Sequence, residues 1–185
     1  GSDLSGANLA GVNFFNANLE GVKLINADLS GADLRNVNLR GANLDGASLK
    51  CANLSYADLY QAHLSGANLQ GAILYRTDLR DVVADNASFI NALIYLGQFS
   101  GKFQGVGLSG AILMTYLSGI DLSGTSLKGV HFQPMAKAVQ QRIGPRSISN
   151  SEAGESYQYE GTEGLDRPKL EGAKLRGADL TGVDL

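Results

Sequence analysis

The chain has 185 residues, of which 24 are Gly and only 3 are Pro, with 44% hydrophobic residues and a formal net charge of −3. This hydrophobic content excludes a disordered polymer, and many Gly with few Pro are typical of a chain rich in tight turns. The single Cys excludes an intrachain disulfide, and no stretch has the apolar length of a membrane span or the pattern of a signal peptide.

Residues 1–132 follow a five-residue period, after an initial Gly1-Ser2 that looks like a cloning scar. Apart from Ala84, a large apolar residue recurs at every fifth position from Leu4 to Phe99, and the residue two places before it is small. A period of five matches neither a helix nor a strand, so the pattern predicts short blocks that stack and bury their large side chains together. The last two positions of each block are expected to face solvent, with Gly or Asn at tight corners.

The block has the form Ala-(Asp/Asn)-Leu-x-x, as in Ala32-Asp33-Leu34-Arg35-Asn36. Because this block recurs through most of the chain, the sequence closely resembles the pentapeptide-repeat family. The resemblance implies an all-β fold, namely a right-handed quadrilateral β-helix with four blocks per coil and short parallel bridges between coils. With four blocks per coil, the blocks of the whole chain predict about eight coils.

The period divides the chain into three parts. Residues 1–132 are predicted to form the pentapeptide-repeat β-helix, residues 133–162 an insertion, and residues 163–185 the final coils of the same β-helix. Within the first part the register slips by one residue before Phe103 and again before Leu117.

One column of central residues tests this packing. Ala84 is undersized in a column otherwise made of Leu, and Phe103 follows it one coil later. We therefore expect Phe103 to fill the space beside Ala84 and to join an aromatic cluster with Phe89 and Phe99.

The insertion is the part of the chain that does not repeat. Pro134 at its start, Gly144 at its end, and Met135, Val139 and Ile143 at a spacing of four predict a short helix with one apolar stripe. The polar residues that follow predict a mobile loop. A functional loop and a tolerated insertion that covers the flank of the coil are equally compatible with this segment.

Residues that carry chemistry are few. His63 and His131 stand where the block normally has Asp or Asn, and Cys51 stands at an outward position, so all three are interpreted as substitutions in the repeat. Asp at the second position of many blocks is expected to accept backbone hydrogen bonds rather than to act in catalysis. We predict no catalytic, cofactor or metal site, and no enzyme activity.

Two outward columns form the candidate binding surface. Positions twenty residues apart lie above one another in such a coil, and these columns carry Arg and Tyr, which are enriched at protein-binding hot spots. We therefore predict a non-enzymatic protein–protein interaction scaffold for an unidentified protein partner, without direct nucleic-acid binding. The most specific contact is expected to use the insert, residues 133–163, or these adjoining columns. The candidate residues are Arg35, Arg40, Tyr60, Tyr75, Arg80 and Tyr95 in the columns, and Arg142, Tyr157 and Tyr159 in the insert.

Two alternative functions stay open. Some members of the family imitate B-form DNA and bind a type II topoisomerase (DNA gyrase), although a net charge of −3 is small for that role. A β-helix enzyme is the weaker alternative. For localisation, the cytoplasm is the default prediction. Because the family occurs in cyanobacteria and plastids, the thylakoid lumen and a membrane-anchored protein are the alternatives. The chain is also compatible with fusion to further domains.

Overall fold

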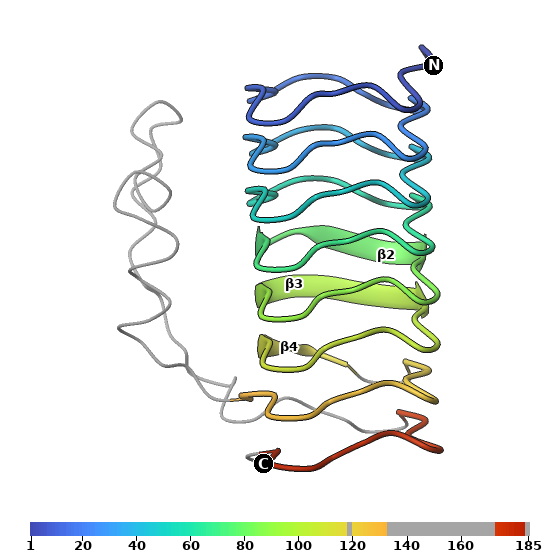
Figure 1. The fold of residues 1–185 in the computed structure, drawn as a ribbon, viewed down its shortest axis with the longest axis vertical. Helices are drawn as coiled ribbons and strands as arrows, with labels where there is room; N and C mark the ends of the chain where they lie inside the picture. The colour runs from blue at the N-terminus through green and yellow to red at the C-terminus, as the bar shows by residue number, and fades with distance from the viewer. Residues whose placement is uncertain (118–119, 133–172, 184–185) are drawn as a thin grey trace, which may run out of the picture.

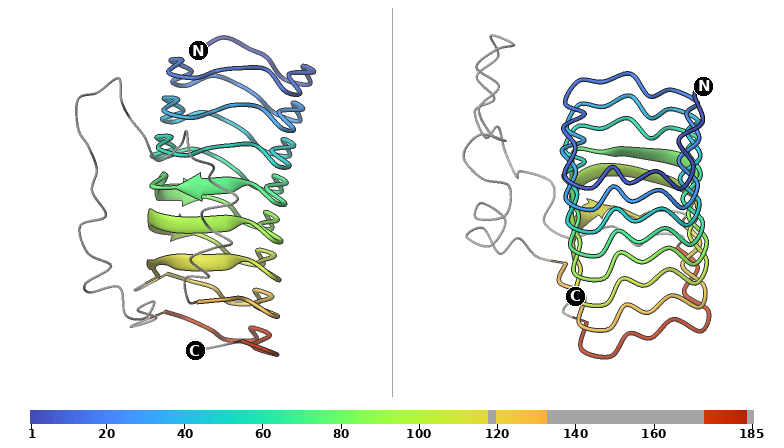
Figure 2. Two further views of the ribbon diagram at one scale, coloured as in Figure 1. Left: turned by 90° about the vertical axis from the view of Figure 1, so that its left-hand side faces the viewer. Right: turned by 45° about the horizontal axis from the view of Figure 1, so that its top comes forward.

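A computed structural model, described for residues 1–117, 120–132 and 173–183, shows the chain as one stack of coils (Figure 1). Parallel bridges join residues twenty positions apart, as in Asp3↔Lys23 and Lys23↔Asn43, so that one coil holds four five-residue blocks. Figure 2 shows these coils from a second side and in a tilted view with the top of the stack brought forward. The chain therefore forms a β-helix, as the repeat and the family resemblance predict.

We number the four faces of the coil by the central residues of the first coil, which are Leu4 for face 1, Leu9 for face 2, Phe14 for face 3 and Leu19 for face 4. The coils are numbered by their face 1 residue. From coil 1 to coil 7 these residues are Leu4, Leu24, Leu44, Leu64, Ala84, Phe103 and Leu122.

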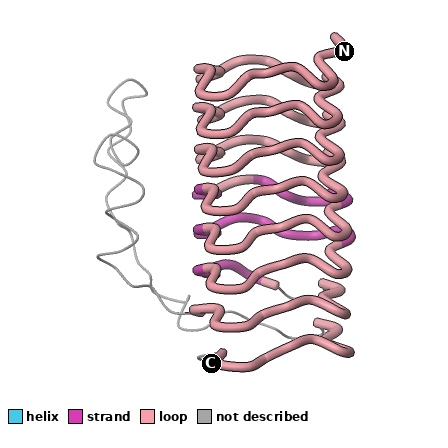
Figure 3. Tube along the Cα trace, viewed as in Figure 1, coloured by secondary structure: helices cyan, strands magenta, loops and turns pink. Residues whose placement is uncertain are grey.

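Regular strands are confined to coils 4 to 6 (Figure 3), and none of the described residues is helical. The strands are β1 (Ile73–Tyr75), β2 (Asp78–Val83), β3 (Leu93–Lys102) and β4 (Ile112–Tyr116). All pair in parallel, in the order β1-β3-β2, with β4 on β3. Because β3 pairs with β1 at its start and with β2 at its end, it turns the corner from face 3 to face 4.

Each block is held by its own backbone and by the coils beside it. The Leu4 amide donates to the Lys23 carbonyl at 2.8 Å, and the Lys23 amide donates to the Ser2 carbonyl at 3.0 Å. The Asp or Asn at the second position accepts the backbone amide two residues later, as Asp58 does from Tyr60 at 3.0 Å. These carboxylates therefore have the structural role that the sequence predicts.

The interior contains the central residues and the small residues two places before them. Leu34 and Leu54 are fully buried, and Ala52 and Ala57 beside them are 0% and 1% exposed. At the block corners, backbone φ is positive, as at Asn36 (φ 56°), which confirms the predicted tight turns.

Both predicted register slips are present. Pairing shortens from twenty residues to nineteen after Leu79, where β2 and β3 are irregular, and Gln98 pairs with Tyr116, eighteen residues later. Phe103 lies beside this irregularity, with its ring centroid 6.5 Å from that of Phe89 and 5.5 Å from that of Phe99. The predicted aromatic cluster is confirmed, because Phe89, Phe99 and Phe103 lie together where the coils shorten.

The repeat resumes after the insertion. Asp121 pairs with Lys174 and Ser126 pairs with Asp179, so residues 173–183 continue the stack directly beyond coil 7. The predicted helix at 134–144, the polar loop and the blocks at Leu165 and Leu170 lie outside the described residues.

Candidate interaction surface

The outer surfaces of the four faces differ strongly. Faces 1 and 2 carry mostly small polar side chains immediately after the central residue, among them Ser5, Asp45 and Ser65 on face 1 and Ser30 and Gln70 on face 2. All four Arg of residues 1–117 lie on faces 3 and 4 or at the corner between them. The Tyr of coils 3 to 5 are on the same side. These Arg and Tyr are Arg35, Arg40, Arg76, Arg80, Tyr56, Tyr60, Tyr75 and Tyr95.

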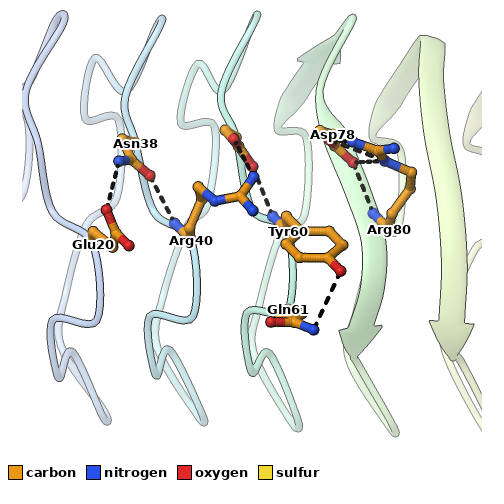
Figure 4. A network of polar contacts seen from close by, with 8 residues as sticks. Glu20, Asn38, Arg40, Tyr60, Gln61, Asp78 and Arg80 are labelled. Carbon is orange, nitrogen blue, oxygen red and sulfur yellow. Dashed lines mark hydrogen bonds and ion pairs between the residues drawn. The ribbon is translucent and has the colours of Figure 1, made fainter.

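On face 4, polar side chains connect successive coils (Figure 4). The Asn38 amide group donates to the Glu20 carboxylate at 3.2 Å, which joins coils 2 and 1. Arg40 Nη1 donates to Asp58 Oδ2 at 2.9 Å, which joins coils 2 and 3. Arg80 binds Asp78 of its own block through Nε and Nη2, with the shortest contact at 2.6 Å. The charged side chains of this face are therefore held in defined positions.

Tyr60 lies between two of these guanidinium groups. The Arg40 guanidinium carbon is 4.5 Å from the centre of the Tyr60 ring, and that of Arg80 is 5.6 Å away. The Tyr60 hydroxyl accepts a hydrogen bond from Gln61 at 3.3 Å. Arg40, Tyr60 and Arg80 thus form one cation–π column across three coils, and the sequence correctly placed them in one column.

Face 3 carries a second column with the same chemistry. Arg35 is paired with Asp33 at 2.5 Å, and its guanidinium group lies 5.2 Å from the Phe15 ring. The hydrogen bond from Arg35 lowers the pKa of the Asp33 carboxyl, although partial burial opposes this. Further along, the Tyr75 and Tyr95 rings are stacked at 5.6 Å. The column is therefore polar and aromatic in coils 1 and 2, and aromatic in coils 4 and 5.

The corner between faces 3 and 4 is unusual in its residues. Corner positions need positive φ, which Gly adopts without strain, and the other three corners use Gly in most coils. At this corner, coils 3, 4 and 5 instead have Tyr56 (φ 61°), Arg76 (φ 52°) and Leu96 (φ 55°). The left-handed conformation costs a bulky residue about 1–2 kcal/mol. Large side chains are therefore placed at this corner against a local conformational cost.

An apolar group on the outside of face 3 was not predicted. Ile73, Leu93 and Ile112 occupy the second position of their blocks, where the repeat normally has Asp or Asn. With Tyr75, Tyr95 and Leu96 they form a hydrophobic cluster separate from the interior. The signal in the sequence was three successive apolar residues in one column, which is visible only after the shortened coil between Leu93 and Ile112 is taken into account.

The remaining predicted positions are dispersed or lie outside the described residues. Arg142, Tyr157 and Tyr159 belong to residues that the structure does not describe. His63 and His131 are exposed on faces 1 and 3, and Cys51 is exposed at a corner. Within the described ranges, no three His, Cys, Asp or Glu side chains are grouped as a metal site would need. Those ranges also contain no helix long and apolar enough to cross a membrane.

Comparison with known proteins identifies the repeat. A sequence model described as Pentapeptide repeats matches eight copies over residues 1–31, 27–66 and 62–94. No sequence among the curated proteins matches the chain. Among solved structures, the chain is similar to HetL, a pentapeptide repeat protein involved in heterocyst differentiation regulation in the cyanobacterium Nostoc sp. strain PCC 7120. The identity is 22%, over 100% of this chain and 87% of that chain, with a TM-score of 0.51.

Two further solved structures are similar. Rfr23 from the cyanobacterium Cyanothece 51142 is 23% identical over 98% of this chain and 87% of that chain, with a TM-score of 0.39. A trypsin-treated variant of QnrB1, a plasmid-mediated fluoroquinolone resistance protein, is 20% identical over 77% and 83%, with a TM-score of 0.44. At these identities the HetL structure supports the fold alone, and none of the matches indicates a catalytic family.

Proposed function

Because this chain belongs to the pentapeptide-repeat family, we propose that it is a non-enzymatic scaffold that binds another protein through one side of its coil. The proposed binding surface consists of the outer side chains of faces 3 and 4 from coil 2 to coil 5. We further propose that the β-helix is right-handed and has eight coils, and that residues 133–162 are a helix-containing insertion.

The main observation in support of this proposal is that Arg and Tyr lie on one side of the coil. If these residues only made the surface soluble, they would be expected on all four faces, since each face has the same solvent-exposed positions. Instead, all four Arg of residues 1–117 and the Tyr of coils 3 to 5 lie on two adjacent faces, whereas Arg176, beyond coil 7, lies on face 1. Tyr56 and Arg76 also occupy positions where Gly would remove a conformational cost. Strain that the fold does not need is a recognised feature of functional surfaces.

The geometry also favours binding. Interface hot spots are enriched in Tyr and Arg, and binding is stronger when side chains lose little freedom on contact. Arg35 and Arg40 are already fixed by ion pairs and by aromatic rings, so a partner would not have to order them. A flat, rigid surface with fixed guanidinium and phenol groups suits a folded protein partner.

The same contacts count against the DNA-mimic alternative. A DNA mimic needs rows of unpaired carboxylates, whereas Asp33, Asp58 and Asp78 on these two faces are each paired with an Arg. The net charge of the chain is only −3. We therefore favour a partner that recognises mixed polar and aromatic chemistry over one that normally binds DNA.

A photo-crosslinking experiment tests the surface. A benzophenone amino acid at Tyr60 (face 4) should capture the partner from a lysate of the source cells, and the same group at Gln70 (face 2, exposed) should not. The captured protein is then purified. Replacing Arg40, Tyr60 and Arg80 together with Ala should weaken its affinity at least about 30-fold, since each is a candidate hot spot.

The matched control replaces Lys50 and Gln70 of face 2 with Ala and should leave the affinity within about twofold. Equal capture from both faces, or equal affinities for the two variants, would contradict the proposed surface. Hydrolysis or modification of the captured protein by this chain would contradict the non-enzymatic role.

A further inference from the structure

The sign of the charge on faces 1 and 2 changes along the coil axis. In coils 1 to 5 these two faces carry two cations, Lys23 and Lys50, and four Asp. From coil 6 onward, the described residues of the same two faces carry four cations and two Asp. We call these four cations the basic patch, and they are Lys102, Lys174 and Arg176 of face 1 and Lys128 of face 2.

The basic patch extends over three consecutive coils. Lys102 pairs with Asp121, and Asp121 pairs with Lys174, so the two Lys lie in one column. They are two coils apart, which is about 10 Å. Arg176 follows in the block of Lys174, and Lys128 lies on the neighbouring face of coil 7. All four residues of the patch are exposed.

These cations differ from the Arg in the columns of faces 3 and 4, which are each held in an ion pair. Among the described residues, the only ion pair of the basic patch joins Lys174 to Asp121 at 3.6 Å, and the Lys174 side chain is 72% exposed. Asp121 and Asp179, the two acids nearby, already accept the backbone amides of Ser123 and Thr181, both at 3.0 Å. The other three cations are therefore available to an anionic partner.

The surface between the cations carries very small side chains. On face 2, Gly107 pairs with Ser126, whose hydroxyl lies 2.9 Å from that of Ser109. On face 1, Ser123 holds the outward position of coil 7. Such residues offer a partner little apolar area to bury, so a contact here depends on charge. They also let the main chain of a partner approach the coil closely.

The shape of the patch favours a chain over a plane. The cations lie on two neighbouring faces that meet at a corner, so a planar membrane cannot lie flat on both, whereas an extended chain can follow the corner. In such a chain, side chains on one side recur about every 7 Å, and a short acidic run reaches cations about 10 Å apart.

We propose that the basic patch binds an acidic, extended segment of another protein, whose carboxylates pair with Lys102, Lys128 and Arg176. This site is separate from the surface proposed on faces 3 and 4. It does not rest on that proposal, because it uses other faces and other coils.

A nuclear magnetic resonance titration tests the site. The isotope-labelled full chain is titrated with decaglutamate at about 0.1 M NaCl, where the Debye length is about 10 Å and distant charges are screened. The largest changes in amide shifts should lie in the blocks of Lys102, Lys128 and Arg176. Lys102→Gln together with Arg176→Gln should weaken the affinity at least about fivefold, because two of the proposed ion pairs are lost.

The matched control is Lys23→Gln together with Lys50→Gln, which removes the same charge from the same two faces. These residues are at least three coils, or about 14 Å, from the patch, so the affinity should stay within about twofold. Equal weakening by both double variants would show that only net charge matters and would overturn the proposal. Shift changes centred on faces 3 and 4 would also overturn it, while leaving the surface proposed there intact.

Two further probes test the class of partner. Phosphatidylserine vesicles and decathymidylate should each bind the unmodified chain more weakly than decaglutamate does. If either bound more tightly and lost affinity with Lys102→Gln and Arg176→Gln, the patch would belong to a membrane or a nucleic acid instead. An absence of shift changes with decaglutamate, in a chain folded by circular dichroism, would contradict the proposal.

Discussion

Faces 1 and 2 and faces 3 and 4 share one interior but carry different outer surfaces. Every face stacks Leu and Ala side chains inside, and the small polar side chains of faces 1 and 2 add little outside. On faces 3 and 4 the outer positions form ion pairs, cation–π contacts and stacked Tyr rings. The interior thus determines that the chain coils, whereas the outer columns distinguish one side of the coil from another. The predictions below test that separation.

The largest effect on stability is expected from substitutions in the interior of the coil. This effect should be the same behind faces 1 and 2 as behind faces 3 and 4. Ala47 of face 2 and Ala57 of face 4 are both buried, with no room for a larger side chain. Ala47→Leu and Ala57→Leu should each lower the free energy of unfolding by about 3 kcal/mol, because the interior would be overpacked. Urea unfolding measures both, with wild type as reference. A large difference between the two would mean that the faces already differ inside.

A smaller effect is expected on the outer apolar row of face 3, which consists of Ile73, Leu93 and Ile112 with Tyr75 and Tyr95 beside them. Leu93→Ala should lower the free energy of unfolding by about 2 kcal/mol, because a buried Leu loses its contacts. Ile25→Ala on face 1, where the outward Ile25 is only partly buried, should cost less than about 1 kcal/mol. Both variants are measured in the same urea series. If Leu93→Ala and Ile25→Ala lowered the free energy of unfolding by similar amounts, the proposed difference between face 3 and face 1 would be contradicted.

Low pH should remove the stabilising contribution of the ion pairs on faces 3 and 4, and the size of this loss should depend on salt concentration. The hydrogen bond from Arg35 lowers the pKa of Asp33. Burial raises the pKa of Asp78, but the interactions with Arg80 together outweigh burial, so the pKa of Asp78 is also lowered. A carboxyl whose folded pKa lies below its unfolded value of about 3.9 contributes stability above that pH, which is lost as the pH falls through the folded pKa. Each pair should contribute about 1 kcal/mol or less.

Unfolding at pH 5 and pH 2 measures this contribution. The wild type should lose more stability on acidification than the Asp33→Asn/Asp78→Asn variant, and 1 M NaCl should reduce the difference by screening the ion pairs. Asp28 on face 2 provides the contrast, because its pKa is lowered chiefly by hydrogen bonds from Ser30 and only to a smaller extent by the charge of Lys50. An Asp28→Asn difference that responds to salt as strongly would contradict the assignment to ion pairs.

The smallest effect compares two exposed cations. Arg40 contacts Asp58 and Tyr60, so Arg40→Ala should lower the melting temperature by a small but measurable amount. Lys50 on face 2 is exposed, and Lys50→Ala should change stability by less than about 0.5 kcal/mol. From the sequence alone both substitutions would be expected to be nearly neutral. Thermal unfolding measures both, and equal melting temperatures for the two variants would contradict a stabilising role for the contacts of Arg40.

The fold could be predicted because its information is local and repeated. The positions of Leu34 and Ala52 in a five-residue period fix which side chains point inward, and Asn36 marks a corner. The column that holds Arg40 and Tyr60 follows from the same count. The ion-pair partners do not follow, because Arg40 bonds to Asp58 in the next coil while Arg35 bonds within its own block. That choice depends on side-chain rotamers, not on spacing.

The outer apolar row could not be predicted for a related reason. Ile73 alone reads as a tolerated exception in one block, and its partner Ile112 enters the same column only because the intervening coils contain one residue fewer. Residues 133–162 lack any period, so no column assigns their side chains to a face. Sequence periodicity therefore predicts the repeat and its two register slips, but it does not predict the apolar cluster on the outside of face 3.

The even spacing of the columns limits the shape of a partner. Side chains in one column are separated by one coil, about 4.8 Å, whereas successive turns of an α-helix are about 5.4 Å apart. A partner helix lying along the coil axis would drift by about 0.6 Å per coil and be half a coil out of step after about four coils. The Arg and Tyr columns extend over about that many coils, from Arg35 to Tyr95. A straight partner helix would therefore lose its match to the columns within an interface of this size.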